Sequence, residues 1–194
     1  MKNTLQILFS TITLVLLMSF SGLKSKKFRV EIIQDGQLIE IVNNTVQLEK
    51  KEFQIRITLK KQDGVFMSSS FRKDYFNLKK DEEIKDYKWL NIKARAENDF
   101  NEDQELMIDD EIVSYLFYDK EKDWHRFDKG VKVNGKKVVG TKKIKQVLIQ
   151  DTKEKIDILN LDNDIYLFFV ATEQWKKGEI PKELGRLKVR ITWK

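Results

Sequence analysis

An alternation of apolar and polar residues with a period of two is the feature that most constrains the fold of this chain. In residues 53–59 four apolar side chains alternate with three polar ones, and residues 187–193 repeat the pattern. Successive side chains of a β-strand point to opposite faces of its sheet, so the alternation indicates strands with one buried and one solvated face. We expect the apolar residues of both segments to share one core: Phe53, Ile55, Ile57, Leu187, Val189 and Ile191.

Similar short runs, separated by turn residues, recur along the chain. Asp35-Gly36 and Asn134-Gly135 are dipeptides typical of two-residue hairpin turns. Helical patterns are few, and we expect short helices or turns only at residues 76–90 and 180–184. Further strands are expected at residues 28–32, 38–42, 46–48, 65–71, 112–118, 131–133, 137–139, 141–149, 156–159 and 164–172.

Many short strands with turn signals between them predict an all-β fold rather than alternating strands and helices. We expect an antiparallel β-sandwich that forms a single domain over residues 22–194, with an up-and-down barrel as the alternative. Within this prediction, the run from Asp162 to Phe168 resembles the segment of immunoglobulin-like domains in which a tyrosine precedes the second cysteine. Tyr166 takes the tyrosine position, and Phe168 stands in place of the cysteine. On the other interpretation, Tyr166, Phe168 and Val170 are simply one apolar face of a central strand.

The N-terminal residues 1–21 have the pattern of a cleavable signal peptide. Lys2 precedes an uncharged stretch over residues 5–20, and Ser19 and Ser21 provide a small-x-small cleavage site before Gly22. We therefore expect a periplasmic or extracellular protein with no membrane span after cleavage, and an uncleaved N-terminal anchor is the alternative. The chain contains no cysteine, so neither a disulfide nor a lipid-bearing thiol can hold it.

No arrangement of residues predicts catalysis. The single histidine, His125, has no nucleophile elbow or glycine-rich oxyanion loop to work with, although Ser68, Ser69 and Ser70 supply hydroxyl groups. The absence of cysteine excludes thiol chemistry and cysteine-ligated zinc. We therefore expect a non-enzymatic protein.

One acidic segment has a spacing suited to calcium. Asp99, Asn101 and Asp103 place oxygen atoms at positions one, three and five of an EF-hand-like count, and Asp110 falls at position twelve. Gln104, however, replaces the glycine of the sharp turn. The alternative is a solvated acidic loop that binds no cofactor.

The charges of the chain are segregated, although the net charge is only +6. Residues 96–119 contain nine Asp and Glu and no Lys or Arg, whereas residues 129–150 contain seven Lys and no Asp or Glu. The acidic segment can neutralise the lysines internally, or an envelope protein or anionic polymer can do so from outside. The residues expected to carry such a partner are Lys136, Lys137, Lys142, Lys143 and Lys145. A net charge this small does not argue for nucleic acid, and we expect none.

Together these features predict an exported, non-enzymatic interaction or accessory domain of the bacterial envelope. The alternative function is a small-ligand carrier built as an up-and-down β-barrel.

Overall fold

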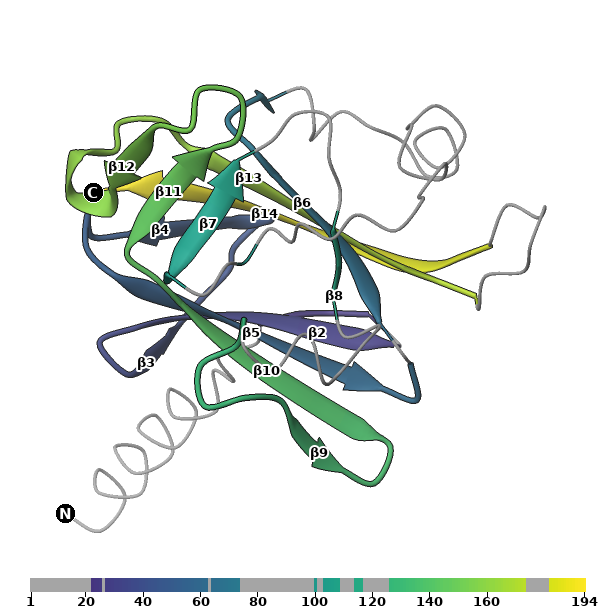
Figure 1. The fold of residues 1–194 in the computed structure, drawn as a ribbon. Helices are drawn as coiled ribbons and strands as arrows, with labels where there is room; N and C mark the ends of the chain where they lie inside the picture. The colour runs from purple at the N-terminus through teal and green to yellow at the C-terminus, as the bar shows by residue number, and fades with distance from the viewer. Residues whose placement is uncertain are drawn as a thin grey trace, which may run out of the picture.

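The computed structural model describes residues 22–25, 27–62, 64–73, 100, 103–108, 114–116, 126–173 and 182–194. Over these residues the chain is all-β, as predicted, with strands in three sheets and a short 3-10 helix at Ile158–Asn160 (Figure 1). The expected signal peptide and the helix expected at residues 76–90 lie outside the described residues.

The largest sheet has six antiparallel strands in the order β1-β2-β5-β10-β9, with β3 paired to β2. Asp35 and Gly36 form the predicted hairpin turn between β2 and β3, and both have positive φ, at 51° and 76°. The turn predicted at Asn134-Gly135 is displaced by one residue, because Asn134 ends β9 and pairs with Lys137, so Gly135 and Lys136 form the turn. Gly135 has a positive φ of 55°. The strands are β1 (Leu23–Lys24), β2 (Phe28–Gln34), β3 (Gln37–Ile39), β5 (Phe53–Lys60), β9 (Lys132–Asn134) and β10 (Lys137–Ile144).

A second sheet has five strands in the order β4-β14-β13-β6-β8. Its strand pairs are antiparallel except for β4 and β14, which run parallel. The expectation of a purely antiparallel sheet is therefore wrong for this pair. A helix or turn was expected at residues 180–184, but Glu183 and Leu184 belong to β14. The prediction is therefore wrong for these two residues. The strands are β4 (Thr45–Leu48), β6 (Val65–Ser70), β8 (Ser114–Leu116), β13 (Ile165–Thr172) and β14 (Glu183–Trp193).

A third, three-stranded sheet was not foreseen as a unit. β7 (Glu105–Ile108) pairs in parallel with β11 (Gln146–Ile149), which pairs antiparallel with β12 (Lys155–Asp157). The chain turns into the 3-10 helix at Ile158, because Asp157 caps that turn by accepting a hydrogen bond from the backbone N–H of Leu159. The strand expected at residues 156–159 is thus shorter than predicted.

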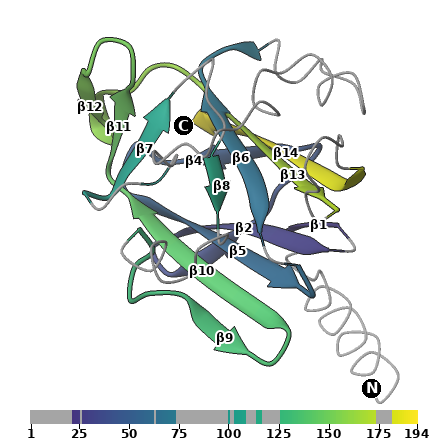
Figure 2. The ribbon, with the colours of Figure 1, turned by 45° about the vertical axis from the view of Figure 1, so that its right-hand side comes forward.

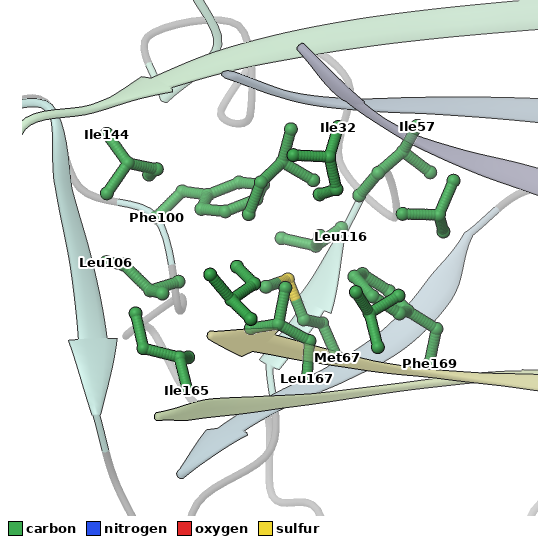
Figure 3. Packing of buried hydrophobic residues seen from close by; sticks show 14 of the residues in the cluster. Ile32, Ile57, Met67, Phe100, Leu106, Leu116, Ile144, Ile165, Leu167 and Phe169 are labelled. Carbon is green, nitrogen blue, oxygen red and sulfur yellow. The ribbon is translucent and has the colours of Figure 1, made fainter. Parts of the chain in front are cut away.

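One hydrophobic cluster takes side chains from all three sheets. Figure 3 shows Ile32 and Ile57 of the six-stranded sheet facing Leu167 and Phe169 of the five-stranded sheet. All six residues predicted to form the core belong to this cluster, with no side chain more than 9% exposed. The phases predicted for β5 and β14 are therefore confirmed.

β13 is buried on both faces. Ile165, Leu167 and Phe169 join the central cluster, while Tyr166 and Phe168 lie buried on the opposite face at 5% and 2% exposure. The guanidinium of Arg190 lies 5.9 Å from the centre of the Tyr166 ring. Tyr166, Phe168 and Val170 therefore share one buried face of β13, a central strand of the five-stranded sheet, and both interpretations of this segment are compatible with that placement.

Candidate functional site

A groove with a volume of about 1110 Å³ runs over the outer face of the six-stranded sheet, which is the face turned away from the central cluster. The strands that form its floor are β2, β5 and β10, and β9 lies at one side (Figure 2). Two of the charged residues that line it are carboxylates, Glu31 and Asp128. Seven are cations: Arg29, Arg56, Lys60, Lys129, Lys132, Lys137 and Lys143.

The strand alternation explains why these residues gather there. Where the odd-numbered residues of β5 enter the core, Arg56, Thr58 and Lys60 must face outward. Directly paired residues share a face of the sheet, and the register sets Arg56 opposite Thr141 and Lys60 opposite Lys137. On the other side of β5, Arg29 pairs with Thr58 and Glu31 with Arg56. The groove is therefore a product of strand pairing over long sequence distances.

One end of the groove, which we call the paired end, is internally neutralised. Glu31 is only 7% exposed, and its carboxylate lies 2.6 Å from Nη2 of Arg29 and 3.8 Å from Nη1 of Arg56. The Lys143 ammonium lies 2.9 Å from Glu52, and this hydrogen bond raises the pKa of Lys143 above its ordinary value. Asp128 accepts a hydrogen bond from the backbone N–H of Lys143 at 2.7 Å. Arg29, Arg56 and Lys143 therefore each lie within ion-pair distance of a carboxylate at this end.

The other end, which we call the lysine end, consists of Lys60, Lys132 and Lys137. All three side chains are exposed, and none has a carboxylate partner among the described residues. Lys60 and Lys137 stand directly opposite each other, a like-charge arrangement that costs up to about 1 kcal/mol. Lys61 and Lys136 extend this positive region beyond the groove, since the backbone N–H of Lys61 donates to the carbonyl of Lys136 at 2.9 Å. Among the described residues, therefore, no carboxylate matches the positive charge at this end.

Lys142 departs from the prediction that it belongs to an exposed basic surface. It is only 2% exposed, because it occupies the inward-facing phase of β10 together with Val138 and Ile144, opposite Ile55 of β5. Of the other lysines predicted to carry an external partner, Lys136 and Lys137 are exposed, while Lys143 and Lys145 lie near Glu52, at 2.9 and 4.0 Å. Lys142 is therefore unavailable to an external polymer in this structure.

Part of the acidic segment is a buried strand, not the solvated loop that was the alternative to a calcium site. Glu105 is 1% exposed, within β7, and its carboxylate lies 2.5 Å from Nζ of Lys155 and 2.6 Å from Nε2 of Gln146. The hydrogen bond to Glu105 raises the pKa of Lys155. Residues 105–108 of this segment thus form a buried strand that carries an ion pair with β12, whereas Lys143 and Lys145 lie near the carboxylate of Glu52.

The predicted calcium ligands are described in part. Asp103 is exposed, with a carboxylate oxygen 3.8 Å from Nζ of Lys155. Asp99, Asn101 and Asp110 lie outside the described residues, and calcium stays a prediction. In the described part of the chain, no group of three or more histidine or acidic side chains is placed to hold a metal ion.

The hydroxyl groups considered for catalysis lie in β6, which is buried throughout. Ser69 Oγ donates a hydrogen bond to the carbonyl of Met107, and Ser68 Oγ is buried without a hydrogen-bond partner. His125 lies outside the described residues. Ser69 therefore joins the five-stranded sheet to β7 of the small sheet.

No family model, no curated protein and no solved structure matches this chain. The function is therefore inferred from the geometry of the groove. A search of the described residues finds no helix with the length and apolar character that a membrane span requires.

Proposed function

We propose that this protein is an exported, non-enzymatic β-sandwich domain, of the immunoglobulin-like type, that binds an anionic partner at the bacterial envelope. The observation that carries the proposal is the groove on the six-stranded sheet, where the described lining residues include seven cations and two carboxylates. A concave surface dominated by one sign of charge attracts ligands of the opposite sign. An anionic polymer or an acidic envelope protein has the required charge.

The strand order supports the immunoglobulin-like architecture. In that fold, with strands lettered along the chain, one sheet contains A, B, E and D, and the other contains C, F and G. When β2, β5, β6, β9, β10, β13 and β14 are lettered in chain order, β2-β5-β10-β9 reads A-B-E-D and β14-β13-β6 reads G-F-C. Tyr166, the second residue of β13, then falls near the start of strand F, where such domains have their conserved tyrosine. The remaining strands are additions to this pattern.

The position of the groove favours an interaction domain over a small-ligand carrier. A carrier holds its ligand in the mouth or interior of a barrel. Here the space between the two larger sheets holds closely packed apolar side chains such as Ile57, Leu116 and Phe169, each fully buried. The groove lies on the outside of one sheet, where a long or extended partner has access.

Export is supported by the contacts of the residues that follow the expected cleavage site. The backbone of Gly22 approaches Val30 so closely that a Cβ atom there would lie 2.5 Å from its carbonyl oxygen, and Leu23 pairs with Val30 in β1. Residues directly after the expected cleavage site are thus part of the sheet. N-terminal sequencing of the exported protein tests this: the sequence should begin at or near Gly22, and retained Met1 on membrane-bound protein would contradict it.

Binding is tested by co-sedimentation of the exported protein with isolated envelopes. A groove variant, with Arg56, Lys137 and Lys143 changed to Glu, reverses cations at both ends. Its matched control changes the exposed lysines Lys73, Lys153 and Lys182, which lie outside the groove, to Glu, so the net charge is the same. We expect the groove variant to lose envelope binding and the control to keep it. Equal binding by all three proteins would refute the proposed function.

A further inference from the structure

We propose that the lysine end of the groove binds a linear anionic polymer, and that it selects this ligand by charge density rather than by the shape of its anionic group. The inference rests on the proposed function and narrows it to one end of the groove and one class of ligand. It starts from the difference between the two ends: Lys60, Lys132 and Lys137 have no carboxylate partner among the described residues, whereas Arg56 and Lys143 do.

A guanidinium group recognises the shape of an anion, because its planar N–H donors form two parallel hydrogen bonds to a carboxylate or phosphate. Both arginines of the groove are already turned toward Glu31. Nη2 of Arg29 contacts that carboxylate, and Nε of Arg29 is buried where a ligand cannot reach it. The groups left for a ligand are lysine ammonium groups, which act as point charges on flexible stems. Such a site responds to the amount of negative charge and little to its arrangement.

The spacing of the three lysines favours a polymer over a single anion. They come from three adjacent strands, β5, β10 and β9, with Lys60 directly opposite Lys137. Lys132 lies on the diagonal from Lys137, since Lys137 pairs with Asn134. Directly paired side chains start roughly 5 Å apart and diagonal ones roughly 7–8 Å apart. A chain that crosses the strands with an anionic group at each such interval meets all three ammonium groups in turn.

The weakness of each contact leads to the same conclusion. An ion pair at an exposed position contributes about 0–1 kcal/mol, so one ammonium group cannot retain one small anion. Several contacts made by one chain add together without a new cost of association for each. Because Lys60 and Lys137 have no carboxylate partner among the described residues, a polymer that binds them displaces no carboxylate in that part of the chain. The like-charge repulsion within that pair falls at the same time.

The test is a binding titration of the exported protein with labelled long-chain polyphosphate and, separately, polygalacturonate. The lysine-end variant changes Lys60, Lys132 and Lys137 to Glu, and the paired-end variant changes Arg56 and Lys143 to Glu. The control variant with Lys73, Lys153 and Lys182 changed to Glu is carried alongside, and circular dichroism shows whether each variant is folded. We expect the lysine-end variant to lose at least tenfold in affinity for both polymers, while the control loses less than about threefold. Polyphosphate, with the higher charge density, should bind more tightly.

The dependence of affinity on salt and competition by orthophosphate, the monomer of polyphosphate, are two further measurements. If about three contacts form, the affinity of the unaltered protein should fall roughly 20- to 40-fold between about 50 and 200 mM salt. Orthophosphate at the same phosphate concentration should not compete. Three results would each overturn the inference. They are competition by orthophosphate, an equal loss of affinity in the lysine-end and paired-end variants, and tighter binding to anionic lipid vesicles than to free polymer. If no polymer binds but envelope co-sedimentation still depends on the groove, this inference fails while the proposed function stands; if envelope binding is absent as well, both fail.

Discussion

Lys60 of β5 and Lys137 of β10 stand directly opposite each other across an antiparallel ladder, on the outer face of the six-stranded sheet. Neither has a carboxylate partner among the described residues, although Glu31 and Glu52 form ion pairs with other cations of the same groove. A like-charge pair in this position lowers the stability of the fold. The arrangement is understandable when the two lysines serve a ligand that is absent from the free protein.

Replacing one lysine of this pair should therefore stabilise the protein while it weakens polymer binding. Lys137→Glu creates an opposite-charge pair with Lys60, and we expect the free energy of unfolding to rise by about 0.2–1 kcal/mol. The double variant Lys60→Glu/Lys137→Glu restores a like-charge pair and should lose that gain. Urea unfolding measures both. A single variant less stable than the unaltered protein would contradict the opposed placement.

The core between the sheets makes a second prediction. Ile57 and Val189 are fully buried in the central cluster, so Ile57→Asp or Val189→Asp places an unpaired charge there and should abolish stable folding. Ile57→Ala should cost about 2–5 kcal/mol through the lost contacts and the cavity. Arg56→Gln, on the neighbouring but outward-facing position, should cost less than about 1 kcal/mol. Similar melting temperatures for Ile57→Ala and Arg56→Gln would refute the strand phase.

The small third sheet depends on the contact between Glu105 and Lys155. Lys155→Met leaves the buried Glu105 carboxylate with one fewer donor, so we expect a lower urea midpoint, whereas Glu105→Gln needs no cation. In the Glu105→Gln background, Lys155→Met should have little further effect. The matched control is Lys153→Met, in the exposed turn between β11 and β12. Additive losses in the double variant would show that the two side chains are not coupled.

The same contact predicts a response to alkaline pH. Because the hydrogen bond to Glu105 raises the pKa of Lys155 in the folded protein, its contribution to stability is complete below the ordinary lysine pKa of about 10.4. That contribution is lost as the pH rises through the raised folded pKa. The difference in urea midpoint between the unaltered protein and Lys155→Met should thus be constant at neutral pH and shrink as the pH rises above about 10.4. A difference that grows with pH would have the wrong sign.

The sequence predicts strands well where one face of the strand is wet. Residues 53–59 and 187–193 alternate because one side of each strand meets water, and the structure places them as expected. β7 was missed because all four of its residues are buried, so its sequence shows no alternation, and the surrounding carboxylates suggested a loop. Local patterns also gave no sign of the two parallel pairs, β4 with β14 and β7 with β11.

The groove could be predicted only in part, for a related reason. The lysines of β10 were identified from their density along the chain, but Arg29, Glu31 and Lys60 join them only because β2 and β5 pair beside β10. Such pairing is not encoded in any short segment. Lys142 looked equivalent to Lys143 in the sequence, yet the phase of β10 turns Lys142 inward and Lys143 outward. An accurate prediction would have required the register of the sheet.

The central claim is that the lysine end of the groove is the surface that meets an anionic polymer, and lysine footprinting tests it most directly. The exported protein is acetylated briefly with and without long-chain polyphosphate, and the modification of each lysine is measured by mass spectrometry. We expect Lys60, Lys132 and Lys137 to be protected by the polymer, while the exposed lysines Lys73, Lys153 and Lys182 react as before. Uniform protection of all lysines, or protection that spares Lys60 and Lys137, would contradict the account.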